Sequence, residues 1–202
     1  MPKSPERCQE IRKEMHSKIL HESMLYFAKN GFAGTKISDL SQYIGIAQGT
    51  LYVYFQSKED LFQEIYSLIN NQHDIQEIKT LASLPISAQK KIHQLSKTIM
   101  QRLEDESYAA KVALNTQMMF EKGRFASQDS TYQSALYQYV AKIIEQGQKE
   151  KSVVEGSSMK LADYYWGVVY LYALKRLFTS QYEMITVEDL ERILLKDSEK
   201  KG

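Results

Sequence analysis

Residues 35–55 are the part of this chain that most restricts its fold. Apolar residues recur at helical spacing over 37–44 and again over 51–55, and Gly45 lies in the break between them. Glycine suits a position where the chain has to reverse, because it tolerates backbone angles that other residues avoid. Two short helices around a glycine-containing turn are typical of a helix-turn-helix, whose second helix enters the major groove of DNA. The spacing predicts that motif here, with a core of Ile37, Leu40, Ile44, Leu51 and Phe55.

The polar side chains of this segment suit contact with DNA. From residue 37 to 57 the only charged side chain is Asp39, and amides and hydroxyls supply the other polar groups. Such groups can donate to phosphates and to base edges. Gln48 is the strongest candidate for reading a base, because a glutamine amide can pair with adenine through two hydrogen bonds. Lys36 and Lys58 bracket the segment near expected helix starts, and we expect both to contact phosphates.

Helices are also predicted for the rest of the chain. Only 9 glycines and 3 prolines interrupt its 202 residues, which argues against a sandwich or barrel because those folds need many turns. The segment 164–172 is rich in β-favouring residues, but its apolar residues keep helical spacing and a lone strand would have no partner. We therefore predict an all-α chain, with an N-terminal three-helix domain over residues 1–57 and a larger bundle over 58–202. Helices are expected at about 6–30, from 58 towards 78, and at about 87–104, 107–122, 129–150 and 158–180, with a capping box at Ser130 and Gln133 and a short last helix capped at Thr186.

Net charge does not identify a binding partner, but hydropathy indicates the compartment of the protein. The chain has 26 basic and 25 acidic residues and a net charge of +1, so its composition does not by itself indicate a nucleic-acid binder. The longest uncharged aliphatic and aromatic run covers only residues 164–174, well short of the roughly 20 residues needed to cross a bilayer. The N-terminal residues lack the apolar core of a signal peptide. We therefore expect a cytoplasmic protein.

No pattern in the sequence indicates catalysis, a cofactor or a metal. Cys8 is the single cysteine, which excludes an internal disulfide and a cysteine-built metal site. Nucleophile elbows, glycine-rich phosphate loops and metal motifs are missing from the sequence. We expect no enzymatic activity, and the rival reading, an enzyme that acquired a DNA-binding domain, lacks a catalytic motif. The histidines, which do not have metal-ligand spacing, are His16, His21, His73 and His93.

The run TKISDLSQYIGIAQGTLYVYFQSKEDLF resembles the DNA-binding region of TetR-type repressors. That region shows a threonine, a helix with an aliphatic-x-x-aliphatic pattern, a glycine turn, and then G-T-L-Y-x-Y-F and S-K-E-x-L. The match is nearly unbroken from Thr35 to Phe62, and the preceding YFAKNGFAGT fits as well. The resemblance covers about the first third of the chain. It implies a homodimeric transcriptional regulator, a repressor by expectation, whose helix-turn-helix domain precedes a helical ligand-binding and dimerisation domain.

The resemblance also implies roles for individual residues. The threonine that opens the second helix touches a phosphate in this family, as do the second aromatic of the G-T-L-Y-x-Y-F motif and the lysine that opens helix four. The tip of the recognition helix meets base edges, and the first tyrosine of the motif contacts a phosphate or a thymine methyl. In this chain the phosphate contacts are Thr35, Tyr54 and Lys58, the base-reading residues are Gln48, Gly49 and Thr50, and the tyrosine is Tyr52.

Four positions depart from the family pattern. The family prefers alanine where this chain has Ser41 and Ile44, so the packing of the second helix is expected to be adjusted. Ala47 stands where a serine or threonine often caps the third helix, which costs about 1 kcal/mol locally. Val53 replaces a frequent histidine or tyrosine and removes one phosphate contact.

For the larger domain the resemblance implies a ligand pocket, and its composition suggests what that pocket holds. Pockets between bundle helices are mostly apolar with a few hydroxyl groups. We therefore expect a small apolar ligand that releases the protein from its operator. The alternative is a regulator of the same fold that a protein partner controls or that takes no small ligand, and a solidly packed bundle would favour it. The candidate pocket residues are Tyr108, Met118, Phe120, Tyr165 and Trp166.

Dimerisation is expected through the helices at about 129–150 and 158–180. The second of these is apolar nearly all round, and a helix that is apolar on every side must be covered on every side. A peripheral helix can bury only one face within its own subunit, so the other face is expected to meet a second copy. The candidate interface residues are Leu136, Val140, Ile143, Ile144, Leu161, Val168 and Tyr172.

Overall fold

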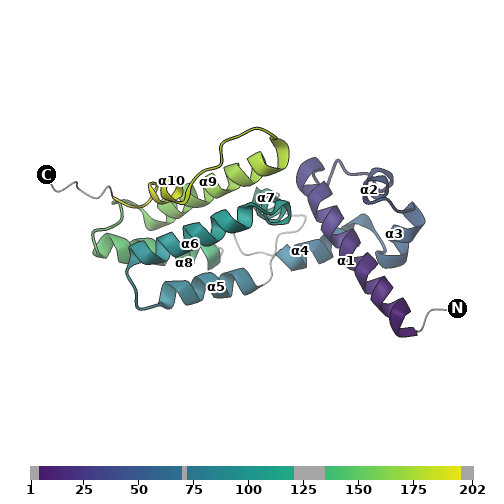
Figure 1. Cartoon of the computed structure of the whole chain (residues 1–202), viewed down its shortest axis with the longest axis horizontal. Coiled ribbons are helices and arrows are strands. Elements are labelled where there is room, and N and C mark those ends of the chain that lie inside the picture. Colours follow the sequence, from purple (N-terminus) through teal and green to yellow (C-terminus); the bar gives the residue numbers. More distant parts are fainter. Residues whose placement is uncertain (1–4, 70–71, 121–134, 197–202) are drawn as a thin grey trace. The chain divides into compact units, whose positions relative to one another are not determined.

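The computed structural model describes residues 5–69, 72–120 and 135–196, and it is built from α-helices (Figure 1). In these three ranges the single β-type pairing is an isolated antiparallel bridge between Val153 and Leu195. The all-α prediction is therefore confirmed. Contacts divide the chain into two compact units, Met1–Asn70 and Asn71–Gly202.

The first unit contains the predicted helix-turn-helix. Its helices are α1 (Pro5–Asn30), α2 (Ile37–Ile44), α3 (Gln48–Tyr54) and α4 (Lys58–Ile69). Gly31 follows α1 with a φ of 72°, and Gly45 ends α2 with a φ of 78°, both in the left-handed region that favours glycine. The Gly45 N–H donates to the carbonyl oxygens of Ser41 and Gln42. The turn between the two short helices therefore forms where the sequence predicts it.

An aromatic cluster of Phe27, Phe32 and Phe62 joins the ends of α1 and α4. The Phe27 and Phe62 rings meet edge to face with centroids 5.2 Å apart, and the Phe32 and Phe62 centroids are 4.6 Å apart. These are favourable spacings for aromatic pairs. The short helices add Leu40, which is wholly buried, and Leu51, which is equally buried. This core leaves the opposite faces of α2 and α3 to solvent.

The boundary between the units differs from the predicted one. The sequence pattern placed it at residues 57/58, but α4 belongs with the first unit, which extends to Asn70. Leu61, Phe62 and Ile65 of α4 are almost completely buried, which explains why the helix groups with α1. Where the sequence predicts a single segment from 58 towards 78, the structure describes two helices, α4 and α5 (Gln72–Ser83).

The second unit is a helical bundle. In it α9 packs against α7 and α8, while α6 contacts α8 and α10. Side-chain caps begin three of its helices: Ser87 for α6, Ser157 for α9, and Thr186, which forms a capping box with Asp189, for α10. The predicted capping box at Ser130 and Gln133 lies outside the described residues. The bounds are α5 (Gln72–Ser83), α6 (Ala88–Leu103), α7 (Glu106–Phe120), α8 (Ala135–Lys149), α9 (Ser158–Phe178) and α10 (Val187–Glu191).

A buried lysine ties α6 to α8. Lys91 is 2% exposed, and its ammonium group donates to the Ala82 carbonyl oxygen at 2.6 Å and to the Gln146 Oε1 at 2.7 Å. These oxygens offset the cost of removing the charge from water. Gln146 also donates to the Ile86 carbonyl oxygen, so one amide side chain joins three segments.

Across the described helices, none combines the length and the apolar character that a bilayer crossing requires.

Candidate DNA-binding surface

Helix α3 has one buried face and one exposed face. Leu51 is fully buried, and Phe55, just after the helix, is 2% exposed. On the opposite side Tyr52 is 48% exposed and Val53 is 65% exposed. Gln48 and Gly49, one turn earlier on the same side, are also exposed. The recognition helix of the predicted motif therefore presents Gln48, Gly49, Tyr52 and Val53 to solvent.

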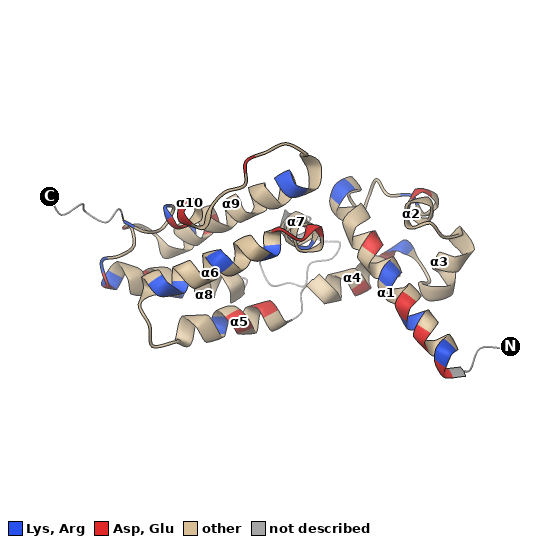
Figure 2. Ribbon diagram, in the orientation of Figure 1, with Lys and Arg blue, Asp and Glu red and all other residues tan. Residues whose placement is uncertain are grey.

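The charged residues of the first unit lie on the elements around α3, and α3 itself has none. Figure 2 shows basic and acidic residues interspersed along α1 and charged residues at α2, whereas α3 carries no charged residue. Lys36 is exposed at the N-cap of α2. A neutral reading helix with basic residues on neighbouring elements fits a surface where phosphate contacts position the protein and base contacts specify the sequence.

Thr35 and Lys58 face the protein more than solvent. Thr35 is 4% exposed, and its hydroxyl donates to the Gly31 carbonyl oxygen at 2.6 Å. The Lys58 ammonium group donates to the carbonyl oxygens of Phe32 and Thr35, both at 2.9 Å, and lies 4.4 Å from the centre of the Phe32 ring. An ammonium group has three N–H donors, so one remains for a phosphate. Both residues thus build the turn between α1 and α2, a role that the sequence pattern did not reveal.

Tyr54 anchors α3 to α1. It is partly buried, with its ring centre 6.1 Å from that of His16 and 6.0 Å from the Arg12 guanidinium carbon. The His16 ring also stacks on Phe55 at 5.0 Å. The predicted DNA-contact residues therefore separate into an exposed group on α2 and α3 and an inner group. The exposed group is Lys36, Gln48, Gly49 and Tyr52, with Thr50 half-buried beside them, and the inner group is Thr35, Tyr54 and Lys58.

Two exposed residues of the helix-turn-helix are not predicted from the sequence as contact residues. Val53 was interpreted only as the loss of a phosphate contact, yet it is the most exposed large apolar side chain in the described part of the chain. Tyr43 of α2 is 45% exposed and packs on Tyr26, with ring centres 5.1 Å apart. Exposed apolar residues on one surface are a signal of binding, but periodicity alone cannot tell them from core residues.

Of the predicted pocket residues, Tyr165 lies in the interior of the second unit, while Tyr108 and Trp166 are half-buried. Tyr165 is fully buried, and its hydroxyl lies 3.0 Å from the Ser96 hydroxyl oxygen. Burial raises the pKa of Tyr165, with the hydrogen bond to Ser96 opposing it, and burial also raises the pKa of Tyr108 to about 12. The Trp166 ring contacts Tyr165 and Tyr137, and its indole N–H has no acceptor among the described atoms. The side chains of Met118 and Phe120 lie outside the described residues.

An open groove of about 360 Å³ lies elsewhere on the second unit. It runs between α6 and the segment that leads into α10, and none of the predicted pocket residues lines it. Methionine, isoleucine and valine side chains make up much of its wall. The lining residues are Lys97, Met100, Gln101, Glu104, Met184, Ile185, Thr186 and Val187.

Four predicted interface residues are core residues of a single subunit. Val140, Ile143 and Ile144 of α8 and Leu161 of α9 are at most 7% exposed, so they are not available to a second copy. Periodicity correctly marked them as apolar but assigned them to the wrong face. The outer face of α8 is polar instead, with Gln138, Lys142, Glu145 and Lys149 exposed. The other three predicted residues, Leu136, Val168 and Tyr172, are half-buried.

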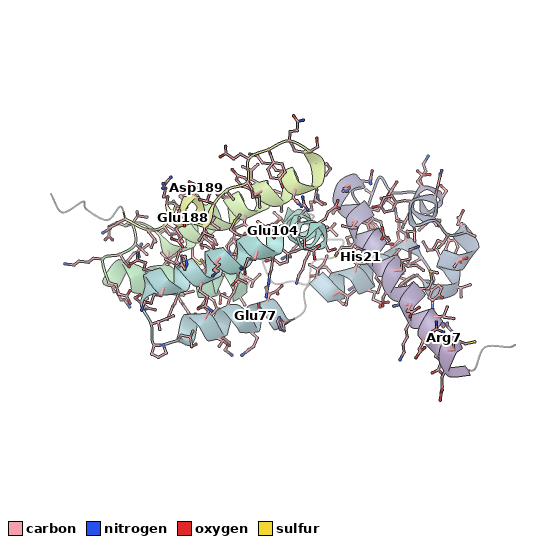
Figure 3. The ribbon with its side chains drawn as sticks, in the orientation of Figure 1. Arg7, His21, Glu77, Glu104, Glu188 and Asp189 are labelled. Carbon is pink, nitrogen blue, oxygen red and sulfur yellow. The ribbon has the colours of Figure 1, made fainter. Side chains whose placement is uncertain are left out.

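His73, Asp74 and Glu77 of α5 bring potential metal ligands within 4.8 Å of one another. Basic side chains already engage the two carboxylates: the Arg102 guanidinium donates to both oxygens of Glu77 at 3.0 and 2.8 Å, and the Lys111 ammonium pairs with Asp74. Glu77 can be followed on α5 in Figure 3. We therefore interpret this cluster as an ion-pair network that joins α5, α6 and α7, because bound cations compete with a metal for the same oxygens.

Comparisons with known proteins point to one family. Residues 19–65 match the family described as bacterial regulatory proteins, tetR family. The HTH-type transcriptional regulator AcrR of Shigella flexneri is 24% identical over 133 residues, 66% of this chain and 59% of that protein. The HTH-type transcriptional regulator TtgR of Pseudomonas putida is 28% identical over 68 residues, 34% of this chain and 32% of that protein. The chain thus spans less than two thirds of the length of these relatives. A solved structure of a HlyIIR mutant shares the fold, with a TM-score of 0.67 and 14% identity over 91% of this chain and 98% of that one.

Replacing Lys58 should destabilise the first unit. Lys58→Met keeps the aliphatic stem but leaves the carbonyl oxygens of Phe32 and Thr35 without their charged donor, which should cost about 1–3 kcal/mol of unfolding free energy. Lys36→Met is the control, because Lys36 is exposed and its loss should change stability by no more than about 0.5 kcal/mol. The midpoints of urea unfolding of the two variants measure this difference in stability. Equal midpoints for the two variants would show that Lys58 does not support the turn.

Proposed function

We propose that the chain is a dimeric transcriptional regulator of the TetR type whose first unit binds operator DNA, and the match of residues 19–65 to the tetR family of bacterial regulatory proteins supports this. The exposed, uncharged face of α3 is the observation that carries the proposal. A buried face of Leu51 and Phe55 holds the helix to its unit, so its outer side chains are available to a major groove about 12 Å wide. We assign base reading to Gln48 and Thr50, and phosphate contact to Lys36 and Tyr52.

Gly49 gives a test of DNA contact that leaves the fold intact. A Cβ added at Gly49 would meet nothing within 4 Å, and alanine is a better helix former than glycine by roughly 0.5–1 kcal/mol. Gly49→Ala should therefore fold at least as stably as the wild type, yet bind DNA more weakly because the new methyl group stands between α3 and the groove. Fluorescence anisotropy with a duplex selected from random DNA measures affinity, and thermal melting measures stability. Unchanged affinity would remove the α3 tip from the interface.

We further propose that the dimer forms through the outer face of α9. Tyr164, Leu171 and Phe178 are 59%, 48% and 56% exposed and stand seven residues apart, so they form one stripe along the helix. The opposite face, which includes Tyr165 and Val169, is buried against the same subunit. A stripe of three large apolar side chains in water is unfavourable, and two copies of α9 packed face to face would cover it. Two recognition helices could then read half-sites one helical turn apart.

A charge placed on this stripe should separate the subunits. Leu171→Glu introduces a carboxylate that would be desolvated in the interface, so the variant should be a monomer and lose operator binding while remaining helical. Leu84→Glu serves as the control, because Leu84 is also exposed but directly follows α5 and is not part of α9. Sedimentation velocity at micromolar concentration distinguishes the states. A monomeric wild type, or a dimeric Leu171→Glu, would contradict the proposal.

For regulation we propose a repressor that a small apolar molecule releases from DNA. The interior of the second unit supports this: Tyr165 and Ser96 bring two hydroxyl groups together beside the Trp166 ring. An apolar interior with a few polar groups is the usual lining of a small-molecule site. A ligand can shift the equilibrium only as far as its affinities for the DNA-bound and released states differ.

Trp166, the single tryptophan of the chain, allows a direct test. A compound from an apolar and aromatic library that weakens DNA binding should also change the fluorescence of Trp166 and raise the melting temperature. Trp166→Phe should lose the fluorescence response and keep DNA binding. If no compound changes emission, melting temperature or DNA affinity, the alternative is favoured, a regulator that a protein partner controls or that takes no small ligand.

A further inference from the structure

We propose that α3 selects A·T base pairs, with Gln48 pairing to adenine and the Val53 side chain packing on a thymine methyl group. The inference rests on the proposed DNA-binding function and specifies the sequence that the operator presents to α3. It follows from the chemistry of the exposed side chains on this helix and on the elements beside it.

Val53 has no structural reason to be apolar. With 65% of its surface exposed it contributes little to the core, which Leu51 and Phe55 supply from the other side of the chain. Gly49 stands one turn before Val53, and nothing lies within 4 Å of the position where its Cβ would be. The surface beside Val53 is therefore open to a close partner. In the major groove the apolar group that such a side chain can contact is the C5 methyl of thymine.

Gln48 supplies the complementary hydrogen bonds. Its side chain is exposed at the first residue of α3, and a glutamine amide offers one acceptor and two donors. Adenine presents an acceptor at N7 and a donor at N6 in the major groove, which matches the amide with two hydrogen bonds. Gln48 thus recognises adenine and Val53 recognises thymine, each in its own A·T pair.

The groups that usually read G·C pairs are missing from α3. Guanine is read most often by Arg or Lys, and cytosine by the carboxylate of Asp or Glu. Residues 48–54 contain none of these four residue types. Of the nearest lysines, Lys36 stands at the start of α2, and the Lys58 ammonium group donates to the Phe32 and Thr35 carbonyl oxygens. Of the carboxylates on neighbouring helices, Asp39 on α2 accepts a hydrogen bond from Ser38, and Asp60 on α4 accepts one from the Gln56 backbone N–H.

Helix geometry sets the spacing of the two contacts. Gln48 and Val53 are separated by five residues, and a helix rises about 1.5 Å per residue, so they lie about 7.5 Å apart along the axis. Base pairs in B-DNA are stacked about 3.4 Å apart. Gln48 and Val53 are therefore too far apart to contact one base pair, and the adenine and the thymine belong to different, nearby base pairs of the half-site.

The test has two parts: selection of binding sites from random duplex DNA, and removal of a single methyl group from a thymine of the selected site. The full-length wild type should enrich half-sites with an adenine and a thymine in different, nearby base pairs. Replacing that thymine by uracil, which differs only in the missing methyl, should weaken wild-type binding about fourfold, the effect of exposing one buried methyl group. Val53→Ala should bind the thymine duplex with a similar loss and should be insensitive to the uracil replacement. Leu84→Ala, a control at an exposed apolar residue of the second unit, should behave like the wild type.

Three outcomes would overturn the inference: G·C pairs enriched at both positions, no response of the wild type to uracil, or an undiminished uracil response in Val53→Ala. Each of them leaves a DNA-binding protein with a different specificity. If selection instead enriches no sequence, the proposed DNA-binding function itself fails. Because Val53 is exposed, circular dichroism should show the same helical content for Val53→Ala and the wild type.

Discussion

The ammonium group of Lys58 donates to the carbonyl oxygens of Phe32 and Thr35, and the arrangement of the helix-turn-helix depends on this contact. The two carbonyls belong to the turn between α1 and α2, and Lys58 is the first residue of α4. One side chain therefore connects the segment that enters the motif with the helix that leaves it. The aromatic cluster of Phe27, Phe32 and Phe62 packs beneath the same junction. With both ends held, α2 and α3 bury Leu40 and Leu51 and turn the uncharged face of α3 outward.

Local sequence patterns predicted the DNA-binding unit well, because its determinants are close together in the chain. The apolar spacing of residues 37–55 defines the two helices, and Gly45 adopts the left-handed conformation that the turn requires. The role of Lys58 was not predictable in the same way, because its partners lie more than twenty residues earlier. A lysine at a helix start indicates a phosphate contact when only neighbouring residues are considered.

The second unit shows where periodicity is insufficient. Apolar spacing on α8 predicted an interface, but the stripe of Val140, Ile143 and Ile144 is core, since α8 is covered within its own subunit. A pattern can identify an apolar face without identifying what covers it. On α9 both faces are apolar, and only burial separates the inner one from the outer stripe of Tyr164, Leu171 and Phe178. The same limit concealed Val53, whose exposure is a property of the folded unit.

The central claim is that the outer face of α3 is the surface that meets DNA. Methyl NMR of the valine-labelled protein tests it directly, because Val53 is 65% exposed on α3 and Val140 is 1% exposed in the core of the second unit. On addition of a selected duplex, the Val53 methyl signals should shift in proportion to the fraction bound, and those of Val140 should change far less. Binding that leaves the Val53 signals in place would contradict the account.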